Sequence, residues 1–277
     1  MYHDEWLDQA KAVPVGQKRR VRHGAESTKA MDVWNNNDSW SVYCHRCHES
    51  SKVYKQFLEK PDLSVPVFRK YLDYSACITL QELAVAHPLK YRSTIVLLQD
   101  KGVSTTILRS LNPMYCLTDD RLVFRFNGVD IGRDATGRSP VKWLKYYQDN
   151  SKGFVYLQGT NTQNVCKVVV LCEDLFSCAK VTWYTGYSTM CLLGTRFEDQ
   201  KVHFILNNQL SVLGAFDDDK GGEFGHRTVR GRCNALSIPY YQVPVPRGLD
   251  PKDLKPIELK QIIEESYNEI SKLCSRY

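Results

Sequence analysis

A continuous apolar run, Lys167-Val-Val-Val-Leu-Cys172, places the strongest constraint on the fold of this chain. A strand that lacks polar residues on both sides is buried on both faces, which is typical of a parallel sheet covered by helices. Further strands are predicted at 189–193, 210–216 and 240–245, and helices at 174–187, 198–206 and 223–233. This alternation predicts a small α/β domain with a mostly parallel sheet.

The third of these strands runs into an acidic turn, residues 217–222, in which three aspartates precede Lys-Gly-Gly. Because side chains alternate along an extended chain, Asp217 and Asp219 are expected to point one way and Asp218 the other. The two glycines are expected to permit a tight turn. Glu173 ends the first strand, and ligands collect at the carboxyl ends of parallel strands. The pattern indicates either a solvated turn or a site for Mg²⁺ or Mn²⁺.

Composition narrows the class of protein. Of 277 residues, 43% are hydrophobic and 25% are charged, as in globular proteins. No apolar stretch approaches the roughly 20 residues that span a bilayer, and the charged N-terminus lacks a signal core. We therefore expect a cytoplasmic protein without a membrane partner. Most of the ten cysteines lie singly in apolar runs and are expected to be buried and unpaired. The net charge of +6 permits an acidic partner such as nucleic acid.

A short hairpin is predicted near the N-terminus, with strands at 30–34 and 40–43 around an Asn-Asn-Asn-Asp turn. Cys44 and Cys47 follow it with metal-ligand spacing, and His23 precedes it. Zn²⁺ takes four nitrogen or sulfur ligands, so either His45 or His48 is a candidate for the fourth position. A metal-free hairpin is the alternative. The preceding basic run, 17–22, is either solvated surface or a phosphate contact.

The middle of the chain has weaker patterns. Residues 49–76 are interpreted as a linker with one helix, and further helices are predicted at 79–86 and within 95–111, broken at Lys101-Gly102. Strands are predicted at 121–126 and 129–133, before a basic loop at 134–140. The amphipathic pattern of the last helix, which ends near Lys272, favours packing against the core over docking a partner.

In this order the features resemble those of the bacterial-type Toprim DNA primases, of the phage-encoded kind, over nearly the whole chain. The Toprim signature is a Glu that ends the first strand and an Asp-x-Asp that ends the third, as do Glu173 and Asp217/Asp219. The zinc ribbon of that family is similar to His23 with Cys44 and Cys47. Other similar segments are Ile131-Gly-Arg133, Pro140-Val-Lys-Trp-Leu144, Leu193-Gly-Thr195 and Pro246-Arg-Gly-Leu-Asp-Pro251.

Three positions depart from the family pattern. Arg20 stands where the zinc motif of the family opens with a Cys. Ser177 stands where a further Asp often occurs, and Asp174 or Asp250 is a candidate to compensate. Lys252 replaces the acidic residue that commonly follows Asp-Pro.

The resemblance implies a division into five parts. These are a zinc-ribbon-like, nucleic-acid-binding module at 1–55, a linker at 56–76, a mixed α+β subdomain of the polymerase core at 77–165, a Toprim domain at 166–248 and a C-terminal helix at 249–277.

It also implies synthesis of short RNA primers on single-stranded DNA from ribonucleoside triphosphates. The implied catalytic residues are Glu173, Asp217, Asp219, Lys142 and Arg133. The implied Mg²⁺ or Mn²⁺ ligands are Glu173, Asp217, Asp219 and, weakly, Asp250, and the Zn²⁺ ligands are His23, Cys44 and Cys47. Nucleic-acid contacts are implied for Arg20, Arg22, Arg46, Arg133, Arg138 and Lys142.

A separate replicative helicase is the expected partner, because no helicase domain follows, and the cytoplasm of an infected bacterial host is the expected location. Two other functions remain open: a Toprim nuclease, and a non-catalytic, primase-derived DNA-binding replication protein.

Overall fold

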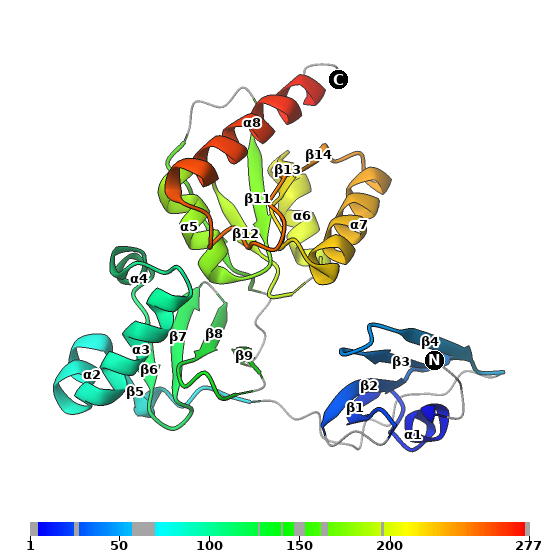
Figure 1. Ribbon diagram of the computed structural model, residues 1–277. Coiled ribbons are helices and arrows are strands. Elements are labelled where there is room, and N and C mark those ends of the chain that lie inside the picture. The colour runs from blue at the N-terminus through cyan, green and yellow to red at the C-terminus, as the bar shows by residue number, and fades with distance from the viewer. Residues whose placement is uncertain are drawn as a thin grey trace. The chain divides into compact units, whose positions relative to one another are not determined.

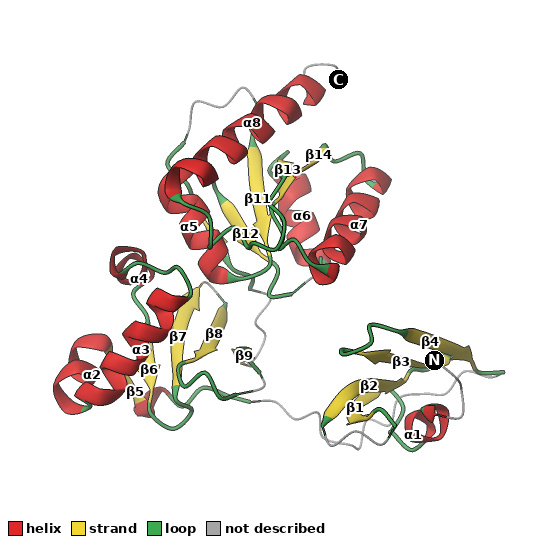
Figure 2. Ribbon diagram, viewed as in Figure 1, coloured by secondary structure: helices red, strands yellow, loops and turns green. Residues whose placement is uncertain are grey.

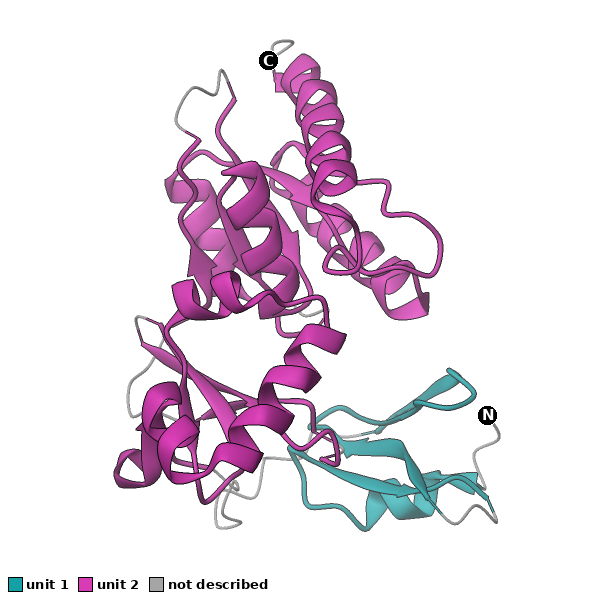
Figure 3. Cartoon of the chain, turned by 60° about the vertical axis from the view of Figure 1, so that its left-hand side comes forward, with its two compact units in different colours: residues 1–68 teal, residues 69–277 magenta. Residues whose placement is uncertain are grey.

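The structure, a computed structural model, describes residues 5–24, 28–56, 70–126, 128–139, 141–146, 153–161, 166–194 and 197–274. The chain divides into two compact units, residues 1–68 and residues 69–277, which Figure 3 shows in different colours. In the part of the chain that the structure describes, no helix has the length and apolar character needed to cross a membrane.

In its described residues, the first unit is a four-stranded antiparallel sheet with one short helix, α1 (Leu7–Lys11). The strands lie in chain order: β1 (Gln17–Arg22), β2 (Lys29–Asn35), β3 (Ser39–Cys44) and β4 (Ser50–Tyr54). The predicted hairpin is confirmed, since β2 pairs with β3 and Asn35 lies opposite Trp40. Met31, Val33 and Val42 pack with Trp6 and Ala10 of the N-terminal segment into a small core.

Two strands of this unit are not among those predicted from the sequence. The basic run, for which no secondary structure was predicted, forms β1, and residues 50–54, expected in a linker, form β4. Neither segment has an apolar face, so their strand conformation comes from pairing with β2 and β3. The rest of the expected linker, for which one helix was predicted without a position, lies mostly at 57–69, outside the described residues.

The second unit begins with an antiparallel sheet in the order β5 (Cys77–Thr79), β6 (Met114–Cys116), β7 (Arg121–Phe126), β8 (Val129–Asp134) and β9 (Trp143–Tyr146). Between β5 and β6 lie α2 (Leu80–Ala86), α3 (Pro88–Asp100) and α4 (Thr105–Leu111). Thr79 and Glu82 form a capping box at the start of α2. The break predicted at Lys101-Gly102 separates α3 from α4, and the predicted hairpin forms β7 and β8.

A second sheet follows, in the order β10-β12-β11-β13-β14. Its strands are β10 (Tyr156–Leu157), β11 (Val168–Cys172), β12 (Thr189–Cys191), β13 (Ser211–Gly214) and β14 (Tyr240–Gln242). All neighbouring pairs are parallel except β10 with β12. The mostly parallel sheet predicted from the alternating pattern is therefore present.

Helices cover both faces of this sheet: α5 (Leu175–Thr185), α6 (Asp199–Asn207), α7 (Lys220–Ala235) and α8 (Pro256–Cys274), visible in Figures 1 and 2. Along β11, Val168 and Val170 pack in the core that includes α5 and α8. Val169 and Leu171 pack in the core that includes α6 and α7. This two-sided burial is what the unbroken apolar run requires.

Helix α8 belongs to the core, as its pattern favoured. Leu259, Ile263 and Ile270 are at most 1% exposed and lie in the same cluster as Val168 and Val170 of β11.

The two sheets of the second unit share a core. Phe176 of α5 contacts Phe124 of β7 and Trp143 of β9, with ring centroids 5.9 Å and 5.0 Å apart. Strand β10 lies before the predicted boundary at residue 166 but pairs with β12. The described residues from 70 onward therefore form one packed body, and the finer division stays a prediction.

Candidate active site

The structure brings Glu173 and the acidic turn together at one edge of the parallel sheet. Strands β11 and β13 are neighbours, with Leu171 opposite Gly214. Glu173 follows β11 directly, and the backbone N–H of Asp217 donates a hydrogen bond to Glu173 Oε1 at 3.3 Å. Parallel strands present their carboxyl ends on one side, so two segments 44 residues apart meet there.

The glycines of the turn have a different role from the expected one. Helix α7 starts at Lys220, not at residue 223, because Asp219 caps it: Asp219 Oδ1 accepts from the Gly222 N–H at 2.8 Å. A Cβ on Gly222 would lie 1.8 Å from the Asp217 carbonyl oxygen and 3.1 Å from Glu173 Oε1. Gly222 thus permits close approach to the carboxylates inside a helical turn.

Asp218 faces another segment, in agreement with the predicted alternation. Its Oδ2 accepts from the Gly248 N–H at 2.9 Å, and its own N–H donates to the Leu249 carbonyl at 3.2 Å. The middle aspartate therefore anchors the loop before α8.

Glu173, Asp217 and Asp219 together form an acidic cluster. Burial and nearby like charge oppose the ionisation of two of its members. Burial, followed by the charge of Asp219, raises the pKa of Glu173 to about 7. Burial, followed by the charge of Glu173, raises the pKa of Asp217 to about 8, although the Lys252 ammonium acts in the other direction. Carboxylates that share a half-buried site without enough positive charge favour binding of a cation.

Lys252 is a member of this site that the sequence pattern did not assign to it. The residue is 8% exposed, and its Nζ lies 3.2 Å from Asp174 Oδ2 and pairs with Asp250 Oδ2. The other oxygen of Asp174 caps α5 by accepting from the Ser177 N–H at 2.9 Å. Both candidates to compensate for Ser177 therefore contact Lys252.

The predicted basic residues divide into two groups. Arg138 and Lys142 are exposed on the loop between β8 and β9. Arg133 is only 9% exposed, and its guanidinium lies over the Trp143 ring at 5.4 Å from the centroid. Every residue of β8 is buried, so Arg133, implied by the resemblance to contact nucleic acid, is not exposed as Arg138 and Lys142 are. Burial lowers its pKa, against the charges of Asp174 and Asp134.

A pocket of about 580 Å³ opens beside the acidic turn. The three aspartates line it together with His226, Arg227 and Arg230 of α7 and the segment that follows β14. The arginines are one α-helical turn apart, a spacing that the sequence analysis did not connect with the carboxylates.

The first unit contains a second cluster of possible metal ligands, His23, Cys44 and Cys47. One ligand atom of each lies within 4.8 Å of the other two, and within the described ranges no other group of three or more His, Cys, Asp or Glu residues is as closely spaced. Cys47 Sγ lies 3.8 Å from His23 Nδ1, and Glu5 Oε2 lies 3.7 Å from His23 Nε2. These nitrogen and sulfur donors suit Zn²⁺.

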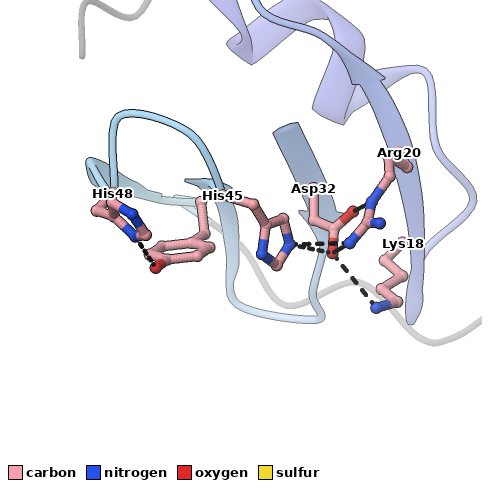
Figure 4. Close-up of polar contacts among 6 residues, drawn as sticks. Lys18, Arg20, Asp32, His45 and His48 are labelled. Atoms are coloured by element: carbon pink, nitrogen blue, oxygen red, sulfur yellow. Dashed lines mark hydrogen bonds and ion pairs between the residues drawn. The ribbon is translucent and has the colours of Figure 1, made fainter. Parts of the chain in front are cut away.

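Neither candidate for a fourth ligand joins this cluster. His45 Nε2 lies 3.0 Å from Asp32 Oδ2, and His48 Nδ1 lies 3.0 Å from the Tyr43 hydroxyl. Arg20, which stands at the position of a family cysteine, donates to Asp32 through Nε at 2.7 Å. Figure 4 shows Asp32 between Arg20, Lys18 and His45, with His48 turned away from it.

The charge environment of Asp32 opposes that of the acidic cluster. Burial alone would raise the pKa of Asp32, but hydrogen bonds from Arg20 and His45 and the charge of Lys18 outweigh it and lower the pKa to about 2. Arg20, at the position where the resemblance expects a cysteine ligand, is thus part of an ion-paired network around Asp32.

No protein-family model and no curated protein matches the sequence. Solved structures do match. The RNA polymerase domain of Mycobacterium tuberculosis primase DnaG has a TM-score of 0.56 at 12% identity, over 70% of this chain and 82% of that chain.

Two further matches extend the similarity. The zinc-binding and RNA polymerase domains of Aquifex aeolicus primase have a TM-score of 0.51 at 14% identity, over 95% of this chain and 83% of that chain. A DnaG primase catalytic domain bound to single-stranded DNA has a TM-score of 0.52 at 15% identity, over 69% and 74%. At these identities the similarity establishes the fold. This chain has the mixed α/β fold of bacterial DnaG primase catalytic domains.

Proposed function

We propose that this chain is a DNA primase of the bacterial Toprim type, which synthesises short RNA primers on single-stranded DNA. The observation that carries the proposal is the contact between Asp217 and Glu173 at the carboxyl edge of the parallel sheet. It supports the role of these carboxylates in a fold that matches primase catalytic domains, one of them bound to single-stranded DNA.

The acidic cluster fits Mg²⁺ or Mn²⁺, because its donors are oxygens and Gly222 leaves the space beside Glu173 Oε1 free of a Cβ. A bound ion would neutralise the triphosphate and activate the attacking hydroxyl. Glu173, Asp217 and Asp219 would hold it, and Asp250 was predicted as a weaker contact. Asp219 would be positioned for this by its cap on α7.

The basic residues would position the substrates. Exposed Arg138 and Lys142 would contact template phosphates, which need point charges and no sequence readout. Arg133 would contribute its positive charge from a buried position, with its guanidinium over the Trp143 ring and within the field of Asp174. The pocket that joins the aspartates to Arg227 and Arg230 suits a ribonucleoside triphosphate, which combines metal-bound phosphates with a flat aromatic base.

The first unit would bind the template through a zinc-ribbon-like module. His23, Cys44 and Cys47 would hold Zn²⁺, with Glu5 next to the outer nitrogen of His23, an arrangement that orients a histidine ligand. Exposed Arg22 and Arg46 would contact phosphates, with Arg20, whose guanidinium already pairs with Asp32. The phage-encoded kind and a replicative helicase partner rest on the sequence resemblance alone.

Primer synthesis on single-stranded DNA, with labelled ribonucleotides and Mg²⁺ or Mn²⁺, tests the proposal. Asp217→Asn should reduce RNA product at least about 100-fold, since loss of a metal ligand costs several kcal/mol of transition-state stabilisation. Asp218→Asn is the matched control, because an amide oxygen can still accept from Gly248. Template cleavage would instead indicate a nuclease, and DNA binding without product would indicate a non-catalytic protein.

Elemental analysis tests the zinc module. We expect about one Zn²⁺ per wild-type chain and none in Cys44→Ser, because three ligands cannot lose one and keep a structural site. His48→Ala should keep its zinc, because His48 lies outside the cluster. A folded, zinc-free wild type would refute this part of the proposal alone.

A further inference from the structure

Lys252 is unusual among the lysines of the second unit because its ammonium is enclosed by the acidic cluster. Its side chain is 10% exposed, and its Nζ lies between Asp174 Oδ2 and Asp250 Oδ2. A buried ammonium is costly unless paired, and here two carboxylates pair with it. Lys252 is therefore a fixed positive charge that also acts on Asp217.

The fold holds the backbone of Lys252 as tightly as its side chain. The Lys252 carbonyl oxygen accepts from Lys180 Nζ at 2.5 Å. A Cβ on Gly102 would lie 2.5 Å from the same oxygen, so the loop that follows α3 packs directly on this segment. Asp174 is fixed in turn by its cap on α5. The ammonium position is thus set by rigid elements on both sides.

This arrangement divides the carboxylates into two sets. Asp174 and Asp250 share the Lys252 ammonium, whereas Glu173, Asp217 and Asp219 have no comparable cation among the ion pairs found in the described residues. Only this second set lacks its countercharge.

We propose that the Lys252 ammonium takes the place of a second divalent cation, so that the acidic cluster binds a single Mg²⁺ or Mn²⁺ through Glu173, Asp217 and Asp219. Asp250, predicted from the sequence as a weak metal ligand, is assigned to Lys252 instead. The inference rests on the proposed function, because it presupposes the metal centre. Lys252 is a positioning residue, since its charge sets the number of ions.

Counting bound Mn²⁺ by electron paramagnetic resonance and calorimetry on the full chain tests this inference, without reference to activity. The wild type should bind one ion at the acidic cluster, identified as the ion lost in Asp217→Asn. Lys252→Gln removes the charge, frees Asp174 and Asp250, and should bind two. Lys252→Arg should bind one, and Lys255→Gln, on an exposed residue of the same loop, should also bind one.

Two ions at the cluster of the wild type would overturn the inference and leave the metal centre standing. A single ion in a Lys252→Gln chain that keeps its wild-type circular dichroism would also overturn it. If that variant fails to fold, the wild-type count still decides. A wild type that binds no Mn²⁺ and makes no RNA would overturn the metal centre itself.

Discussion

Asp32 in the first unit and Asp217 in the second are both carboxylates that the fold removes from water, with opposite electrostatic consequences. Asp32 is 3% exposed and lies within 3.5 Å of side-chain nitrogens from Lys18, Arg20 and His45. Its pKa falls to about 2. Asp217 is next to Glu173, and its pKa rises to about 8.

The difference separates a structural network from a candidate functional site. At Asp32 the cations Lys18 and Arg20 are supplied by the neighbouring strand β1, so the network is complete within the protein and stabilises the sheet. At Asp217 the neighbouring charges are mostly of the same sign, so the fold keeps an arrangement that costs stability. Such clusters are typical of sites where a ligand supplies what the protein lacks.

The largest effect is expected from a substitution that introduces steric overlap next to Asp217 and Glu173. Gly222→Ala should destabilise the second unit by about 3 kcal/mol, because its Cβ would overlap the Asp217 carbonyl. It should also reduce primer synthesis at least about 100-fold, since small displacements of catalytic groups have effects of that size. Denaturant unfolding and the primer assay measure the two effects.

Gly231→Ala is the control for this change. Gly231 lies on the same helix, α7, and a Cβ there meets nothing within 4 Å. Alanine should therefore stabilise the helix by up to about 1 kcal/mol. Wild-type RNA synthesis by Gly222→Ala would show that the close approach of the turn to Glu173 is not needed.

The next largest effect is expected from removing the charge of Asp32, which its cationic neighbours compensate. Asp32→Asn should destabilise the first unit by about 2 kcal/mol at pH 7, because Arg20 and His45 lose a charged acceptor, although both are partly exposed. The folded pKa of about 2 lies below the ordinary value of about 3.9. The stabilisation is therefore complete above pH 4 and is lost as the pH falls through 2.

Calorimetric unfolding of the wild type and of Asp32→Asn, at pH 7 and in acid, measures how the difference in their stability shrinks as the pH falls. Asp8→Asn is the control, because Asp8 is 92% exposed in an i,i+3 pair with Lys11 and should change stability by less than about 0.5 kcal/mol. A difference that stays constant into acid would mean that the Asp32 network contributes shape and no charge.

The smallest effect has the opposite sign: removing the charge of Asp217 should stabilise the metal-free protein, whereas removing that of Asp32 should destabilise it. Asp217→Asn should stabilise the metal-free protein by at least about 1 kcal/mol at pH 8. The folded pKa of about 8 lies above the ordinary value, so the wild-type penalty is absent below pH 4 and grows as the pH rises to 8. Melting temperatures across that range should separate progressively.

Excess Mg²⁺ should reverse the order of the melting temperatures, because it stabilises only the wild type. Asp218→Asn provides the reference at each pH. If Asp217→Asn destabilises the metal-free protein, the acidic cluster has an internal countercharge beyond Lys252.

The sequence predicted the parallel sheet, and the positions of Glu173 and Asp217 at one edge of it, because both depend on local patterns. An unbroken apolar run reveals burial on two faces, and residues that end neighbouring strands must meet at one edge. The role of Gly222 was not predictable, since a glycine beside aspartates is equally typical of a turn, and only the packed position of Glu173 distinguishes the two.

Three-dimensional pairing also decided what the sequence left open. Arg20 and His45 appear near zinc-ligand positions, yet both contact Asp32, Arg20 from the adjacent strand β1 and His45 from the turn after β3. Strands β1 and β4 carry no apolar alternation, so no local signal marks them. Lys252 looks like a surface lysine until α5 places Asp174 against it.

The packing of helix α8 also affects how the protein folds during synthesis. The Cys166 N–H, just before β11, donates to the Tyr267 hydroxyl at 3.4 Å across 101 residues. At translation rates of about 5 to 20 residues per second, Tyr267 is synthesised roughly 5 to 20 seconds after Cys166, so until then one face of β11 lacks the part of its cover that α8 provides. The apolar run that organises the fold is therefore incompletely covered, and partly accessible to chaperones and to other nascent chains, until α8 leaves the ribosome.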